Sequence, residues 1–104
     1  MWLKQPKAKA LDRAGAEALA AEAMAFLTAD EARLTRFLGD SGLDPAALAA
    51  AISAGGGGVI EAALEHVVSD ESLMLVFASE IRRKPEELMA AQALLAGPMP
   101  FSSI

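Results

Sequence analysis

The residues with the most potential for chemistry lie around the single histidine, His66. On a helix, Asp70 would lie one turn after His66, and a His–Asp pair of this kind could act as a general base. The chain has no cysteine, no tyrosine and no second histidine, and neither Ser69 nor Ser72 belongs to a nucleophile motif. We therefore interpret His66 as a helix-end histidine stabilised by the helix dipole, and we predict no catalytic residue, no metal site and no cofactor.

A run of four glycines, Gly55–Gly58, is the second feature that could bind a ligand. Phosphate-binding loops combine glycines with a Gly-Lys-Ser/Thr ending, because the lysine and the hydroxyl contact the phosphates and their metal ion. That ending is missing here, so the sequence does not predict nucleotide binding.

Nucleic-acid binding is the alternative function, because two predicted helices joined through 39–44 have the length and central glycine of a helix-turn-helix. A recognition helix needs arginine, lysine, asparagine or glutamine to reach base edges. Residues 45–52 read PAALAAAI and offer none. The basic residues Arg82, Arg83 and Lys84 are interpreted as solvated charges at a helix end. We therefore do not expect nucleic acid as a partner.

Composition and charge indicate a cytoplasmic protein of one domain. The chain has 104 residues, no cysteine and no apolar run long enough to span a membrane, and residues 1–10 do not read as a secretion signal. Residues 1–13 carry a net charge of +3 and the remainder −8. We interpret residues 1–12 as a basic N-terminal arm, and residues 98–104 as a C-terminal tail.

The second half of the chain repeats the first at an offset of 40 residues, from 15–52 onto 55–92. Nine of the 38 aligned positions are identical, where chance in so alanine-rich a chain gives about four. The matches include Asp30 with Asp70, Phe37 with Phe77, and Pro45 with Pro85. We therefore predict two pseudo-repeated three-helix halves within one helical domain, residues 13–97, with the two phenylalanines in equivalent core positions.

Helical periodicity supports an all-α fold of about six helices. Apolar residues recur on one side of 12–28, while Asp30, Asp44 and Asp70 are good N-caps for the helices that follow them. Gly42 is predicted to end the second helix, and the third is predicted to run to about Ser53. Loops are expected near 41–43, 55–58 and 83–84, since four consecutive glycines are poor helix formers.

The cap and core residues also resemble a known family. Residues 25–27 read AFL, 33–38 read RLTRFL and 42–48 read GLDPAAL, followed by SDESL at 69–73. This arrangement resembles a small all-helical alphaproteobacterial family of unknown function, domain-of-unknown-function family 3572. The resemblance would cover roughly residues 15–96 and implies no activity, cofactor or catalytic residue.

A non-enzymatic protein-protein interaction or self-association module is the function that the sequence favours. The fifth predicted helix is apolar on every side over 73–78, whereas the corresponding part of the second helix carries two arginines. A helix of this kind must be covered, either within the chain or by a partner. We predict Leu75, Val76 and Phe101 as the contact residues, with an unknown protein or a second copy as partner. The alternative is that the tail containing Phe101 folds back over this helix.

Overall fold

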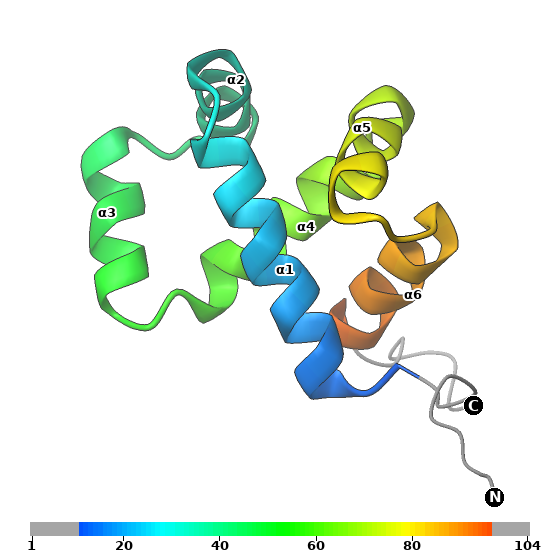
Figure 1. Ribbon diagram of the computed structural model, residues 1–104. Coiled ribbons are helices and arrows are strands. Elements are labelled where there is room, and N and C mark those ends of the chain that lie inside the picture. Colours follow the sequence, from blue (N-terminus) through cyan, green and yellow to red (C-terminus); the bar gives the residue numbers. More distant parts are fainter. Residues whose placement is uncertain (1–10, 97–104) are drawn as a thin grey trace, which may run out of the picture.

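The structure is a computed structural model that describes residues 11–96, and over this range the chain forms six α-helices and no strand (Figure 1). The helices are α1 (Arg13–Thr28), α2 (Glu31–Ser41), α3 (Pro45–Ser53), α4 (Gly57–Val68), α5 (Glu71–Ile81) and α6 (Pro85–Ala96). None of these described helices is long and apolar enough to cross a membrane. The predicted all-α domain of six helices is confirmed, while the internal repeat stays a prediction.

Aspartate side chains begin four of the helices, because a carboxylate can accept a hydrogen bond from an amide that has no partner inside the helix. Asp12, Asp30, Asp44 and Asp70 each have an extended backbone and accept from the first turn. The donors are the amides of Gly15, Ala32, Ala47 and Leu73, at 2.8, 3.0, 2.7 and 3.2 Å. The caps predicted at Asp30, Asp44 and Asp70 are therefore confirmed.

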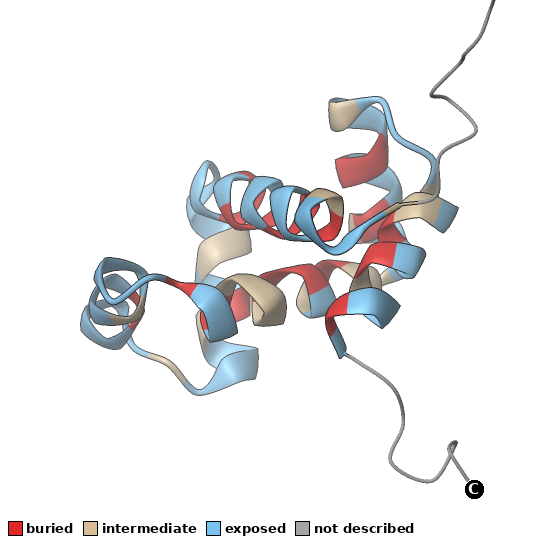
Figure 2. Ribbon diagram, turned by 90° about the horizontal axis from the view of Figure 1, so that it is seen from below, coloured by how far each residue is buried: buried red, intermediate tan, exposed pale blue. Residues whose placement is uncertain are grey.

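Helices α1 and α4 cross at the centre of the molecule, and the other helices are arranged around this pair (Figure 1). Helix α6 packs against both central helices, α2 packs mainly on α1, and α5 packs on α4 and α6. The buried residues of the core are all apolar. Their ribbon segments, red in Figure 2, lie mainly where the helices face one another. Its largest fully buried members are Phe37, Phe77, Leu19, Leu27, Leu64, Leu88 and Val67.

Helix α3 is the most peripheral of the six. It packs against α4, and Leu48 is its single buried side chain. Four of the other eight positions on α3 are exposed alanines, which bury little apolar surface. The stability of α3 therefore rests mainly on its cap, on Leu48 and on the helix propensity of alanine.

The prediction that all four glycines form a loop is wrong in part. Gly55 and Gly56 have positive φ angles of 118° and 75° and make the turn, but Gly57 and Gly58 form the first turn of α4. Gly56 is buried, and its carbonyl accepts from the Ile60 amide at 2.7 Å. A Cβ atom at Gly56 would lie 2.9 Å from the Ile60 side chain. Packing of the apolar residues that follow holds the first turn of α4 in place despite its low helix propensity.

Helices α2 and α5 end in the same backbone conformation with different residues. Gly42 at the end of α2 has φ of 77°, as predicted for a helix-terminating glycine, and Arg82 at the end of α5 has φ of 58°. This left-handed region suits glycine, whereas a residue with a Cβ is strained in it. Arg82 is the only non-glycine residue with positive φ between residues 11 and 96.

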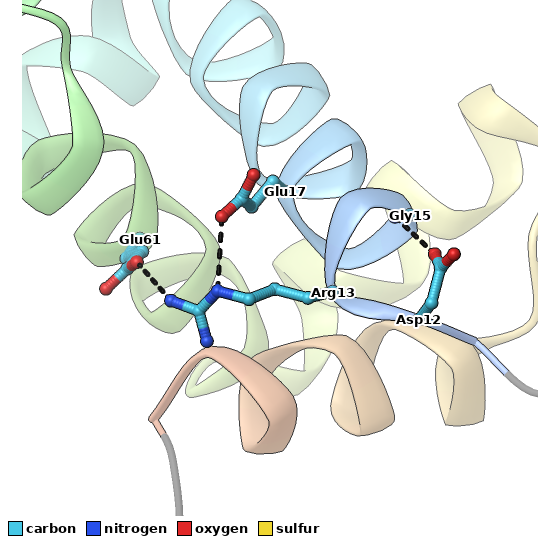
Figure 3. A network of polar contacts seen from close by, with 5 residues as sticks. All are labelled: Asp12, Arg13, Gly15, Glu17 and Glu61. Atoms are coloured by element: carbon cyan, nitrogen blue, oxygen red, sulfur yellow. Dashed lines mark hydrogen bonds and ion pairs between the residues drawn. The ribbon is translucent and has the colours of Figure 1, made fainter.

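One exposed ion-pair network connects the two central helices near the start of α1 (Figure 3). The guanidinium of Arg13 lies 3.3 Å from a Glu17 carboxylate oxygen in the same helix and 3.7 Å from a Glu61 oxygen in α4. Because all three side chains are at least 40% exposed, solvent screens these pairs, and each contributes little to stability.

Candidate functional site

Helix α5 carries two of the three residues predicted to contact a partner. Its start is fixed by the Asp70 cap and by Glu71 in the first turn, where a negative charge is favoured by the helix dipole. Its end is fixed by backbone bonds from the Arg82 and Arg83 amides to carbonyls of the last turn. Both ends of α5 are therefore capped, and the side chains between them project from a regular helix.

The two faces of α5 differ in burial. Met74, Phe77 and Ala78 are buried against the rest of the molecule. Leu75 and Val76 lie on the opposite side and are 48% and 45% exposed. Ser72 and Ser79 are also exposed, three or four residues from the aliphatic pair, so all four side chains share one face of the helix. We call this set the α5 face.

Phe101, the third predicted contact residue, lies outside the described residues. Other large apolar side chains are exposed as well, and the sequence reasoning did not select them. They are Ile52 on α3, at 44%, and Met89 and Leu94 on α6, at 51% and 36%. Isolated exposed apolar residues are common on protein surfaces. The α5 face differs because two such residues are adjacent in the sequence.

The structure places His66 in the last turn of α4, as predicted for a helix-end histidine, and next to Asp40 instead of in the alternative pair with Asp70. The His66 Nδ1 atom lies 3.6 Å from an Asp40 carboxylate oxygen on α2, while the Asp70 carboxylate caps α5. The imidazole side chain is 12% exposed and meets the Phe37 ring edge-on, with ring centroids 5.3 Å apart. His66 thus joins α4 to α2. Within residues 11–96, no three histidine or acidic side chains are grouped so that they could hold a metal ion.

A second cluster, which the sequence analysis did not anticipate, connects α1, α2 and α5. The Arg33 guanidinium carbon lies 3.9 Å from the centre of the Phe26 ring, and Arg33 forms ion pairs with Asp30 at 3.5 Å and Glu80 at 3.7 Å. Phe26 in turn packs on Phe77, with ring centroids 4.9 Å apart. Periodicity assigns the phenylalanines to buried faces, but it does not indicate that they meet.

The model of one family, described as Protein of unknown function (DUF3572), matches residues 13–98. No curated protein and no solved structure matches the chain. The match covers all six helices.

Proposed function

The chain belongs to the family described as Protein of unknown function (DUF3572), and we propose that it is a non-enzymatic interaction module that binds another protein or a second copy of itself. The proposal rests on one observation. Leu75 and Val76 are adjacent aliphatic residues that are about half exposed on a helix whose ends are both fixed. The cytoplasmic location predicted from the sequence is part of this proposal.

The size of the α5 face favours a weak or moderate contact. Complete burial of a leucine or valine side chain is worth about 1.5–3 kcal/mol, and roughly half of each side chain is already covered, so about 1 kcal/mol remains for each. That contribution is enough to form the apolar centre of an interface, which polar contacts at its rim would complete. Ser72 and Ser79 flank the pair and can supply such contacts.

The test replaces each aliphatic residue by aspartate and measures association by sedimentation velocity over a range of protein concentrations. Leu75→Asp and Val76→Asp are expected to leave a folded helical monomer that no longer associates with itself or with the partner that co-purifies with the wild type. The matched control is Ile52→Asp, because Ile52 is exposed to the same degree but lies on α3. This variant should associate like the wild type.

Two outcomes would contradict the proposal. In the first, the wild type forms no oligomer and retains no partner at any concentration tested. In the second, the α5 variants associate as well as the wild type, which would mean that the aliphatic pair makes no contact with a partner.

A further inference from the structure

One solvent-facing side of α4 forms the floor of two adjoining hollows. The first lies between α4 and the end of α6 and has a volume of about 170 Å³, and the second lies between α4 and the end of α2 and has a volume of about 380 Å³. Ala62 and Glu65 line both hollows. The α4 residues that line them follow one another at spacings of three and four positions from 58 to 69, so they share one side of the helix. We call the two hollows together the α4 groove.

Three accessible carboxylates surround the α4 groove. Glu61 and Glu65 belong to α4, and Asp40 belongs to α2. The Glu61 side chain is 40% exposed and that of Asp40 is 66% exposed. Glu65 is exposed and forms no ion pair with any residue between 11 and 96. Among residues 11–96, His66 is the only basic residue that lines the groove, so the local charge favours a cationic occupant.

A basic residue at the beginning of α1 already contacts one end of this groove. The Arg13 guanidinium lies 3.7 Å from a Glu61 carboxylate oxygen (Figure 3). The described part of the chain begins at residue 11, two positions before this arginine. The segment formed by residues 1–10 is therefore joined to the helical body close to the first hollow.

Residues 1–10 have the charge and the length to occupy the α4 groove. They contain three lysines and no acidic residue, a net charge of +3, whereas residues 11–96 carry fourteen acidic and six basic side chains, a net charge of −8. Ten extended residues span about 33 Å, while the α4 positions from 58 to 69 cover about 16 Å. Because the segment is joined to α1, its local concentration at the groove is on the order of millimolar, so weak ion pairs are sufficient for binding.

We propose that residues 1–10 of the chain bind in the α4 groove. The lysine ammonium groups pair with the carboxylates of Glu61, Glu65 and Asp40, while their methylenes lie over the half-buried Ala62. All of these groups are at the surface, so the contact requires no opening of the core. Covalent connection favours this segment over a basic segment of another molecule, which must also overcome the entropy cost of association. The proposal is independent of the α5 face.

Zero-length carbodiimide cross-linking of the full chain tests the contact directly, because the reagent joins an amine to a carboxylate that lies within ion-pair distance. The linked peptides are identified by mass spectrometry. We expect the three lysines of residues 1–10 to link to Glu61, Glu65 and Asp40 in preference to the other eleven of the fourteen acidic side chains. Links distributed evenly over all fourteen would overturn the proposal.

Trp2, the single tryptophan of the chain, reports on the same contact in solution. Its fluorescence anisotropy should exceed that of a free peptide of residues 1–10, and it should fall in about 1 M salt, where the screening length is about 3 Å. Glu65→Lys should lower the anisotropy at low salt as well. The same change should reduce the yield of links to Glu61 and Asp40 by on the order of tenfold, because it replaces an attraction by a repulsion.

Glu22→Lys is the matched control for Glu65→Lys. Glu22 is also exposed and without an ion pair to residues 11–96, but it lies on α1 outside the α4 groove. This variant changes the net charge equally and should leave the Trp2 anisotropy and the cross-links as in the wild type. Equal effects of the two variants would mean that the lysines respond to the overall charge of the helical body, and the proposal would be wrong.

Two further experiments identify other occupants of the groove. Nitrogen-15-labelled and unlabelled chains are mixed before cross-linking, and we expect every link to join two peptides of the same isotope. Links between labelled and unlabelled peptides would assign the groove to a second copy of the chain. We also expect the variant with Met99 and Phe101 both replaced by serine to cross-link like the wild type. If links to Glu65 form only in this variant, residues 97–104 occupy the groove, and the assignment to residues 1–10 is wrong.

Discussion

The rings of Phe26 and Phe77 meet with their centroids 4.9 Å apart and their planes inclined at 45°. Phe26 belongs to α1 and Phe77 to α5, so this contact joins segments that are distant in the sequence. Such tilted aromatic pairs add about 0.5–1.5 kcal/mol beyond the burial of their surfaces. The pair therefore fixes the position of α5, and with it the α5 face, relative to the central helices.

Replacing Phe37 or Phe77 by alanine should strongly destabilise the protein. The two side chains are 1% and 0% exposed, which confirms their predicted core positions, and each change would leave a cavity. We expect a loss of about 3–5 kcal/mol in the free energy of unfolding, measured by urea denaturation. Val76→Ala, an exposed position on α5, is the control and should change stability by about 0.5 kcal/mol or less. A loss below about 1 kcal/mol at either phenylalanine would contradict the observed packing.

Arg33 should stabilise the fold through its contact with the Phe26 ring. The coupling between the two side chains can be isolated by a double-mutant cycle of Arg33→Ala and Phe26→Leu, followed by thermal unfolding. We expect a coupling energy of about 0.5–1 kcal/mol, because the arginine side chain is only partly desolvated. The same cycle with Arg36→Ala, also on α2, should give no coupling. Equal coupling for both arginines would mean that the contact with Phe26 is not specific.

Arg82→Gly should make the protein more stable. Arg82 adopts φ of 58°, a region in which a side chain is strained and glycine is not. Relief of this strain is expected to add about 0.5–1 kcal/mol to the free energy of unfolding. The reverse change, Gly42→Ala at φ of 77°, should reduce stability by a similar amount. If Arg82→Gly lowers the melting temperature, the contacts of the arginine side chain outweigh its backbone strain.

Amide hydrogens of α3 should exchange with solvent faster than those of the other five helices. Leu48 is the one buried side chain of α3, whereas α2, which also has one, adds the half-buried Leu34 and Leu38 to the core. Local opening is easiest where few apolar contacts must break. Hydrogen exchange followed by NMR measures this directly. Asp44→Ala should accelerate exchange in α3 further, because it removes the cap on the Ala47 amide. Protection of α3 equal to that of α1 would contradict the prediction.

The helix ends could be predicted from the sequence because they depend on neighbouring residues. A capping aspartate and the amide that it satisfies lie two or three residues apart. The partner of His66 could not be predicted in this way. Asp70 lies one turn away, but Asp40, on a different helix, provides the carboxylate that His66 approaches. That choice depends on how α2 crosses α4, and no local pattern specifies the crossing.

The candidate surface was predictable only in part for the same reason. The sequence predicts Leu75 and Val76 as contact residues because residues 73–78 are all apolar, yet their exposure follows from which side of α5 faces α4 and α6. The cluster of Arg33, Phe26 and Glu80 likewise requires three helices that are apart in the sequence. The glycine run was predicted to be a loop because glycine has a low helix propensity. Packing nevertheless holds Gly57 and Gly58 in the first turn of α4.

The central position of α1 has a consequence for synthesis of the protein. Of the six described helices, α1 emerges from the ribosome before the others, but much of its apolar side is covered by α4 and by α6, the last of the six. Chains grow at about 5–20 residues per second, so this surface stays open for several seconds before its partners exist. A nascent chain that carries only α1 to α3 exposes apolar side chains such as Leu19 and Leu27, which are buried in the complete fold. The apolar surface available to chaperones is therefore largest during this interval.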